Sequence, residues 1–229
     1  MPVICFANPK GGSGKTTTAL LLATELAGKG AAATIIDADP LQWISAWGRL
    51  PGRPPNLSIV SEGISEDTIV DAIEDAGRTS QFVIVDLEGT ASLMVTNAIM
   101  MSDLVIIPLQ GSAMDAKGGA KILKAIRNAE KVTNRQIAYA VVLTRTGAAI
   151  TSRALRNVAD QLHKSGVDVL TTPIVERAAY RDMFDFGGTL EGLNPSQVSN
   201  IDKAITNARE FTGEVLAKLK SSAAARRAA

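Results

Sequence analysis

Aromatic residues, cysteine, histidine and long apolar runs are all scarce in this 229-residue sequence. Aromatic side chains make up only 4% of it, which argues against a base-stacking surface for single-stranded nucleic acid. Cys5 is the single cysteine and excludes an internal disulfide, and the single histidine, His163, leaves nothing that resembles a zinc site. No apolar stretch approaches the roughly 18 residues of a transmembrane helix, and no signal peptide is recognisable. These absences favour a soluble protein of the reducing cytoplasm.

The charge of the chain is nearly balanced in total but not along its length. The net charge is +1, yet residues 1–111 carry −6 and residues 112–229 carry +7. A basic half on an otherwise acidic protein suggests a surface that faces a polyanion. Solvated helix faces, which carry many lysines in any protein, explain the same asymmetry, and charge alone does not choose between the two.

Short apolar runs alternate with helix-length segments along the chain. The runs expected to form strands are Val3–Ala7, Ala33–Ile36, Leu57–Val60, Phe82–Val85, Leu104–Leu109, Ile137–Leu143 and Val167–Leu170. The segments expected to form helices are Lys15–Ala27, Glu66–Ala76, Ser92–Met101, Lys117–Lys131, Thr151–Lys164 and Gln197–Lys220. This alternation predicts an α/β fold, with a mostly parallel sheet flanked by helices on both faces. We expect a single domain over residues 1–220 and a flexible tail over 221–229, where large apolar residues are rare.

The glycine-rich sequence KGGSGKTT, residues 10–17, lies between the first predicted strand and the first predicted helix. Glycines let the backbone curl so that several N–H groups point at phosphate oxygens, and the helix N-terminus adds a favourable dipole. Lys15 supplies a positive charge near the β- and γ-phosphates, and the Thr16 hydroxyl is suited to Mg²⁺. The residues expected to contact a nucleotide in this segment are Gly11, Gly12, Ser13, Gly14, Lys15, Thr16 and Thr17. The segment therefore predicts a domain of the P-loop NTPase type.

Carboxylates follow two further predicted strands. Asp37 and Asp39 end the second run in IIDADP, and two residues of separation puts both side chains on one side of an extended segment. Asp86 follows the apolar run FVIV, the shape of a Walker B strand whose aspartate holds Mg²⁺ through water. Ligands of open α/β sheets bind at the carboxyl ends of strands, so these groups suit Mg²⁺ or an attacking water. A plain helix cap by Asp39, just before Pro40, is the alternative for that residue.

With these motifs in order, the chain resembles the ParA/MinD family of deviant Walker ATPases, and most of all its small ParA-type DNA-segregation members. The similarity rests on KGGSGKTT at 10–17, DADP at 37–40, VIVD at 83–86 and SDLVIIPL at 102–109. It covers nearly the whole chain and is most specific up to Leu109. Two departures stand out. Pro9 replaces the first glycine of the general phosphate-loop pattern. Glu88 lies in a segment that contains proline in many members of the family.

The resemblance implies roles for these residues. Lys10 would be the family's additional lysine, which reaches the partner's nucleotide in a dimer that holds two ATP molecules between its subunits. Lys15 would bind phosphate, Asp39 would orient the hydrolytic water, and Thr16, Asp37 and Asp86 would hold Mg²⁺. Arg145, at the end of a late strand, would contact the adenine. ATP and Mg²⁺ are thus the implied cofactors, with slow turnover that a partner stimulates.

The resemblance also implies partners and a cellular location. The ParA-type members bind double-stranded DNA without sequence preference, which places such proteins on the nucleoid in the cytoplasm, with a centromere-binding or cargo-adaptor protein as second partner. The basic residues expected to contact DNA are Lys117, Lys121, Lys124, Arg153, Arg156, Arg177 and Arg181. The function implied is partition of plasmid or chromosomal DNA, and positioning of another cargo, such as a chemoreceptor cluster or a conjugative transfer complex, is the alternative.

A MinD-like membrane-associated ATPase is the third possibility. It would need a C-terminal amphipathic helix with bulky apolar residues. Phe211, Val215 and Leu219 do recur at spacings of four, but nothing larger than alanine, apart from basic residues, follows them. A stripe that short is more often packed on a sheet, so no stable membrane association is expected.

Overall fold

Seven parallel strands form the centre of the computed structural model, which describes residues 1–89, 92–110, 113–147 and 153–228. Their order across the sheet is β3-β2-β4-β1-β5-β6-β7. The strands are β1 (Val3–Phe6), β2 (Ala33–Ala38), β3 (Leu57–Val60), β4 (Phe82–Leu87), β5 (Leu104–Leu109), β6 (Ala138–Thr146) and β7 (Ile174–Val175). Every neighbouring pair is parallel, as continuous apolar runs joined by helices predict.

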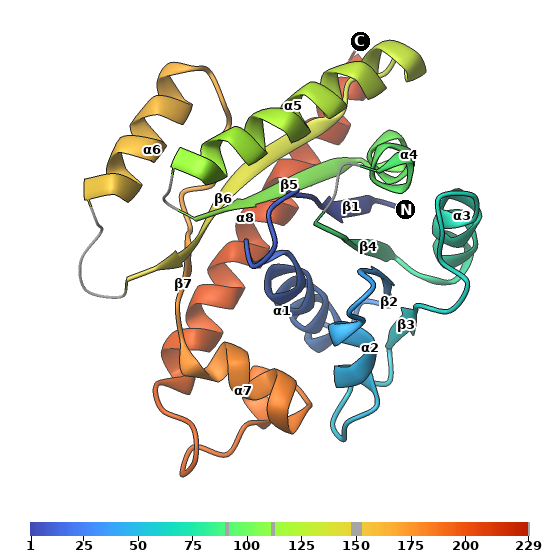
Figure 1. Ribbon diagram of the computed structural model, residues 1–229. Helices are drawn as coiled ribbons and strands as arrows, with labels where there is room; N and C mark the ends of the chain where they lie inside the picture. Colours follow the sequence, from blue (N-terminus) through green and yellow to red (C-terminus); the bar gives the residue numbers. More distant parts are fainter. Residues whose placement is uncertain (90–91, 111–112, 148–152, 229) are drawn as a thin grey trace.

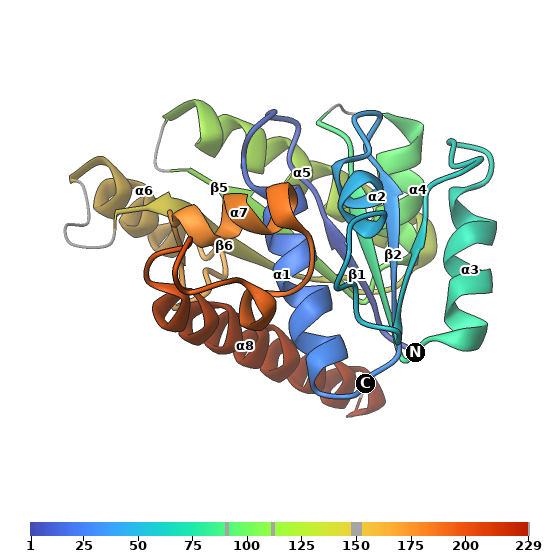
Figure 2. The same ribbon diagram turned by 90° about the horizontal axis from the view of Figure 1, so that it is seen from below.

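Helices cover both faces of this sheet (Figures 1 and 2). The helices are α1 (Lys15–Gly28), α2 (Trp43–Gly48), α3 (Ile69–Thr79), α4 (Leu93–Met101), α5 (Ala113–Thr133), α6 (Arg153–Lys164), α7 (Ala178–Phe186) and α8 (Ile201–Ala228), with a short 3₁₀ turn at Leu190–Gly192. One apolar core joins α1, α2, α7 and α8 to the sheet, and the other joins α3, α4 and α5 to the opposite face. The expected architecture is confirmed.

Alternation along β1 shows how one strand serves both cores. Ile4 and Phe6 belong to the core under α1 and α8, whereas Val3 and Cys5 belong to the core under α4 and α5. Successive strand side chains point to opposite faces, so a strand buried on both sides is apolar at every position. Cys5 is fully buried, and burial raises the pKa of its thiol to about 12, so this thiol is a structural one.

One predicted strand, Val167–Leu170, is wrong. This run meets β6 only at Val141, whose N–H donates to Asp168 and whose carbonyl accepts from Leu170. The chain then passes Pro173, which has no N–H for a ladder, and the edge strand forms at β7 instead. The short helices α2 and α7 were missed, because 6 and 9 residues contain too few turns for a clear periodic pattern.

The C-terminal helix is longer than its sequence predicts. The expected tail at 221–229 continues α8 as far as Ala228. Arg226 anchors this end, since its guanidinium donates to the Asp103 carboxylate at 2.5 Å and to the Asp103 carbonyl at 2.8 Å. Phe211, Val215 and Leu219 are buried against the sheet, so their stripe is part of the core.

Candidate nucleotide-binding site

The glycine-rich loop joins the end of β1 to the start of α1, at the carboxyl edge of the sheet. Gly12 and Gly14 have φ values of 73° and 100°, a left-handed conformation that residues with a side chain rarely adopt. Gly14 directly precedes α1, and the N–H and hydroxyl of Thr18 both donate to its carbonyl. The loop therefore ends on a helix N-terminus, where unpaired N–H groups and the helix dipole favour an anion.

Asn8 holds the beginning of this loop, a role that the sequence reading missed. Its side chain is buried, and its Nδ2 donates to the carbonyl of Pro108 on β5 at 2.6 Å. Its Oδ1 accepts from the backbone N–H of Lys10 at 2.9 Å. An asparagine at the end of an apolar strand, just before a glycine-rich loop, is the sequence signal that would have indicated this role. Asn8 thereby ties Lys10 to the neighbouring strand.

Asp37 and Asp86 lie directly opposite each other at the ends of β2 and β4. Asp37 Oδ2 accepts hydrogen bonds of 2.8 Å from both the backbone N–H and the hydroxyl of Ser45 on α2. Asp37 Oδ1 and both oxygens of Asp86 are buried without a hydrogen bond of ordinary geometry. Burial raises the pKa of Asp86 to about 8, with Asp37 and Asp39 acting in the same direction and the Thr16 hydroxyl and Lys15 opposing it. Burial also raises the pKa of Asp37.

Lys15 is buried among these carboxylates. Its side chain is only 5% exposed, and burial lowers the pKa of its ammonium group, while the charges of Asp86, Asp39 and Glu88 oppose that shift. The segment after β4 lies against the loop, since a Cβ added to Gly89 would sit 3.6 Å from Lys15 Nζ. Glu88 thus contributes negative charge near Lys15.

These residues fit a Mg²⁺–nucleotide. Three buried carboxylate oxygens without ordinary partners need a cation, and Thr16, in the first turn of α1, stands beside Asp86. Within the described ranges, no three His, Cys, Asp or Glu side chains form a metal cluster by themselves. Mg²⁺ usually takes only one or two carboxylates and completes its shell with phosphate and water. The site is therefore suited to a metal that arrives with a phosphate ligand.

Asp39 lies at the edge of this site and is half-buried. Its Oδ1 accepts from the backbone N–H of Leu41 at 2.9 Å, so it supports the turn that leads to α2. The N-cap of α2 is Gln42 and receives no side-chain cap bond, so Asp39 does not cap that helix.

A cavity of about 110 Å³ opens beside the loop. Gly14 and Thr18 line one side, and Arg145, Arg177 and Arg181 contribute from β6, the end of β7 and α7. Arg145 has a φ of 51° and lies with its guanidinium near Gly12. The structure thus places Arg145 next to the loop, together with Arg177 and Arg181, which were expected to contact DNA.

The basic residues predicted to bind DNA lie on both faces of the sheet. Lys117, Lys121 and Lys124 are exposed on α5, and Arg156 is exposed on α6, on the same side of the sheet. Arg153 begins α6. Arg177 and Arg181 lie at α7 on the other side, and Arg181 pairs with Glu176 at 3.3 Å. One chain does not gather them into a single patch.

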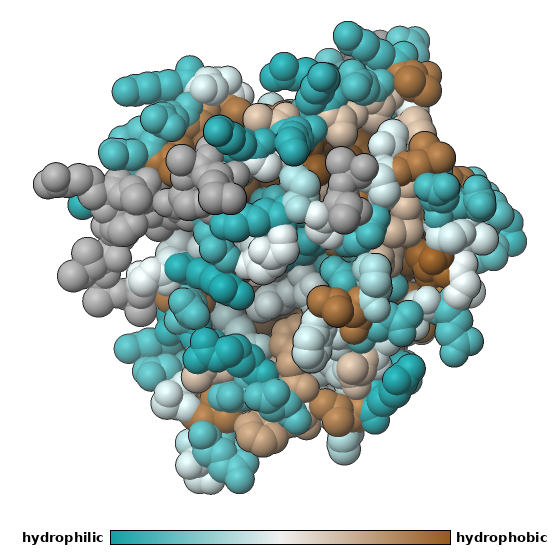
Figure 3. Space-filling model, viewed as in Figure 1, coloured by the Kyte–Doolittle hydropathy of each residue, from teal (hydrophilic) through white to brown (hydrophobic). Residues whose placement is uncertain are grey.

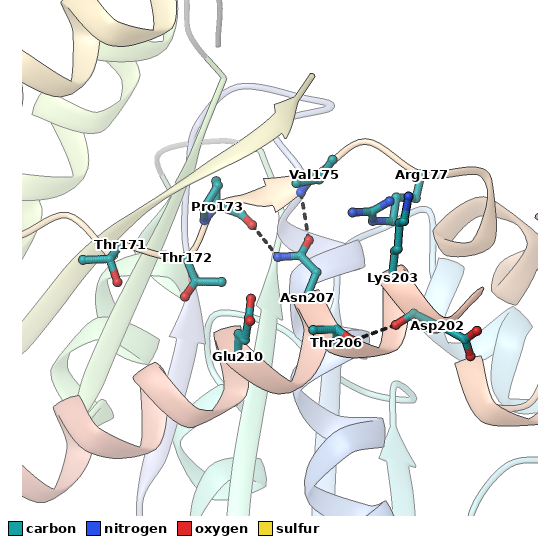
Figure 4. Close-up of a pocket in the computed structure, with 10 residues that line it drawn as sticks. All are labelled: Thr171, Thr172, Pro173, Val175, Arg177, Asp202, Lys203, Thr206, Asn207 and Glu210. Atoms are coloured by element: carbon teal, nitrogen blue, oxygen red, sulfur yellow. Dashed lines mark hydrogen bonds between the residues drawn. The ribbon is translucent and has the colours of Figure 1, made fainter. Parts of the chain in front are cut away.

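A larger cavity, of about 440 Å³, lies between β7 and α8 (Figure 4). Asn207 closes one side of it, donating to the Pro173 carbonyl and accepting from the Val175 N–H. Its lining carries charges of both signs, including Arg177 and Glu210, which favour no single class of charged ligand. The nucleotide loop contributes nothing to it.

The face of the molecule shown in Figure 3 is mainly hydrophilic, with hydrophobic side chains in separate small patches. The large apolar residues that are most exposed within the described ranges are Met1, Leu41, Trp43, Leu93, Val132 and Phe186. None of the helices in those ranges combines the length and apolar character needed to cross a bilayer.

Residues 4–190 match the family model described as the CobQ/CobB/MinD/ParA nucleotide binding domain. Protein ParA from Rhizobium radiobacter is 41% identical over 219 residues, which cover 96% of this chain and 98% of that protein. Maintenance of carboxysome distribution protein A from Halothiobacillus neapolitanus is 28% identical over 197 residues, covering 85% of this chain and 87% of that protein.

Solved structures share the fold at lower identity. A putative plasmid partition protein from Borrelia burgdorferi, bound to AMPPNP, superposes with a TM-score of 0.72 at 17% identity, covering 95% of this chain and 99% of that chain. An ATP complex of a McdA variant from Cyanothece gives a TM-score of 0.73 at 17% identity, covering 93% and 96%. At these identities the likeness extends to the fold.

Proposed function

Because the chain belongs to the CobQ/CobB/MinD/ParA family of nucleotide-binding domains, we propose that it is an ATP hydrolase that dimerises on ATP and partitions DNA. The observation that carries the proposal is the group of Lys15, Asp37 and Asp86 beside a loop with two left-handed glycines. Buried carboxylates at the carboxyl ends of parallel strands, beside a buried lysine at a helix N-terminus, are typical of a site that binds a charged ligand.

In this proposal ATP phosphates lie in the loop formed by residues 10–17. Thr16, Asp37 and Asp86 hold the Mg²⁺, which supplies charge neutralisation for the phosphates when bound. Lys15 pairs with phosphate oxygens and is itself desolvated, which strengthens that attraction. Arg145, whose guanidinium lies near Gly12, contacts the nucleotide from β6, and adenine contact is the role that the family resemblance implies for it. The Asp39 carboxylate orients the attacking water.

Lys10 completes the site of a second copy of the chain. It stands at the outer start of the loop, and Asn8 fixes its backbone. A lysine that reaches a partner's nucleotide acts as an arginine finger does, so that each site is complete only in the dimer. ATP then holds two chains together, and its hydrolysis releases them.

The dimer binds double-stranded DNA without sequence preference, through the exposed lysines of α5 and the arginines of α6 and α7. Phosphate contacts alone explain binding that ignores sequence, and two chains double the number of contacts. The protein is accordingly nucleoid-associated in the cytoplasm, with a centromere-binding or cargo-adaptor protein that stimulates slow turnover. The 27% identity over 184 residues to Chromosome partitioning protein ParA from Caulobacter vibrioides supports DNA as the cargo.

Positioning of a different cargo by the same mechanism is the second candidate. It is favoured by the 28% identity to a maintenance of carboxysome distribution protein. A membrane-associated role is less supported, because the apolar stripe of α8 is buried in the core and does not face solvent.

The proposal is tested by binding to random-sequence duplex DNA with ATP, ADP or no nucleotide, over a salt series. We expect binding with ATP only, which falls steeply as salt rises. Lys10→Ala is the matched variant, which should bind ATP and keep its fold but lose both dimerisation and DNA binding. Equal DNA binding in all nucleotide states, or ATP-dependent dimers of the Lys10→Ala variant, would overturn the mechanism.

A further inference from the structure

Two carbonyl groups of the phosphate loop are held by side chains from other parts of the chain, one on β6 and one just after β5. The Thr144 hydroxyl on β6 donates to the Ser13 carbonyl at 2.7 Å, across 131 residues of sequence. The Gln110 amide, just after β5, donates to the Gly12 carbonyl across 98 residues. Gly12 and Ser13 are adjacent, so two consecutive peptide groups of the loop are held by side chains from outside the loop.

The orientation of a peptide group follows from its carbonyl. The C=O of one residue and the N–H of the next point in opposite directions in a planar trans peptide. A donor that holds the Ser13 carbonyl therefore aims the Gly14 N–H away from β6, and a donor on the Gly12 carbonyl does the same for Ser13. Left-handed glycines leave such a loop many conformations, so its N–H groups converge only if something holds the peptides.

The environment of Thr144 makes this grip firm. Thr144 is 2% exposed, and its side chain also packs against Gly14, where an added Cβ would meet the Thr144 methyl carbon at 3.2 Å. A buried hydroxyl with one short bond is a well-defined anchor, because losing that bond leaves the carbonyl unsatisfied. The hydroxyl of Thr144 holds the Ser13 carbonyl and its methyl group packs against Gly14, so both act on the peptide group between Ser13 and Gly14.

We propose that Thr144 and Gln110 are positioning residues for phosphate binding, which orient the N–H groups of Gly14 and Ser13 toward the nucleotide. This inference rests on the proposed function, since it specifies how the same loop holds phosphate. Neither residue needs to touch the nucleotide. Their effect passes through the peptide groups that they hold.

The test is the affinity for ADP, measured by titration calorimetry well below the unfolding temperature of each variant. Thr144→Val removes only the hydroxyl and keeps the methyl against Gly14, and we expect about tenfold weaker ADP binding. Thr144→Ser restores the hydroxyl and should bind ADP nearly as the wild type does. Thr34→Val is the matched control, because Thr34 is equally buried and bonds Ser80 at 2.6 Å, at the start of β2 and far from the loop.

Gln110→Met is the second variant and covers the case in which Thr144→Val does not fold. It should weaken ADP binding as well, and the two changes together should not be additive, because they act on adjacent peptide groups. Unchanged ADP affinity in Thr144→Val, or an equal loss in Thr34→Val, would overturn the positioning role while leaving the proposed function standing. A wild-type protein that binds neither ADP nor ATP would instead refute the proposed function.

Discussion

Gly118 lies on α5 directly against Asn8. A Cβ added there would sit 2.9 Å from Asn8 Oδ1, closer than real Cβ contacts come. Asn8 cannot give way freely, because its amide bonds the Pro108 carbonyl at 2.6 Å and the Lys10 N–H at 2.9 Å. Gly118→Ala should therefore push Asn8 out of at least one of these bonds and displace the start of the phosphate loop.

The magnitude follows from two opposing effects. Alanine is favoured over glycine in a helix interior by about 1 kcal/mol, which stabilises any helical Gly→Ala variant. A buried amide or its partner left without a hydrogen bond costs about 1–3 kcal/mol. Gly213→Ala on α8 measures the first effect alone, because an added Cβ there meets nothing within 4 Å. We expect the unfolding free energies of the two variants to differ by about 1–3 kcal/mol, with Gly118→Ala the less stable.

Urea unfolding of both variants gives that difference, and light scattering with ATP reports dimerisation. Gly118→Ala should dimerise less readily at equal ATP saturation, because Lys10 is displaced, whereas Gly213→Ala should dimerise as the wild type does. If Gly118→Ala is stabilised as much as Gly213→Ala and dimerises normally, Asn8 does not hold the loop in the way described.

Two further predictions concern catalysis and pH. Asp39→Ala should keep ATP-dependent dimers that no longer dissociate, and normal phosphate release by that variant would rule out its role in hydrolysis. Burial alone would raise the pKa of Glu214, but bonds from the N–H and hydroxyl groups of Thr171 and Thr172 lower it overall. Its stabilising contribution should therefore be full above the unfolded pKa of about 4.3 and be lost as the pH falls through the lower folded value. Glu214→Gln should cost about 1 kcal/mol at pH 7, discounted for partial exposure, and progressively less as the pH falls below about 4, so a difference that stays constant in urea titrations over that range would contradict the assignment.

Local sequence patterns were enough to predict most of the fold. Six of the seven strands fall where continuous apolar runs stand, because a strand buried on both faces needs apolar side chains at every position. Local pattern failed at β7, where two residues pair beyond Pro173, and at α2, whose six residues span under two turns. It also failed at the end of α8, where a polar and alanine-rich segment is held by Arg226 and Asp103 from distant parts of the chain.

The phosphate loop and its carboxylates were readable in the sequence because their chemistry is carried by adjacent residues. Glycine next to lysine and threonine indicates a phosphate loop, and an aspartate after an apolar run indicates a strand-end carboxylate. Both are recognisable without knowing how the rest of the chain folds. The contacts that shape the site are different, because Asn8 meets Pro108 across 100 residues and Thr144 meets Ser13 across 131. Those pairs, and the register that sets Asp37 opposite Asp86, depend on the spatial order of the strands across the sheet. That order is decided by packing over the whole sheet, not by any local stretch of sequence.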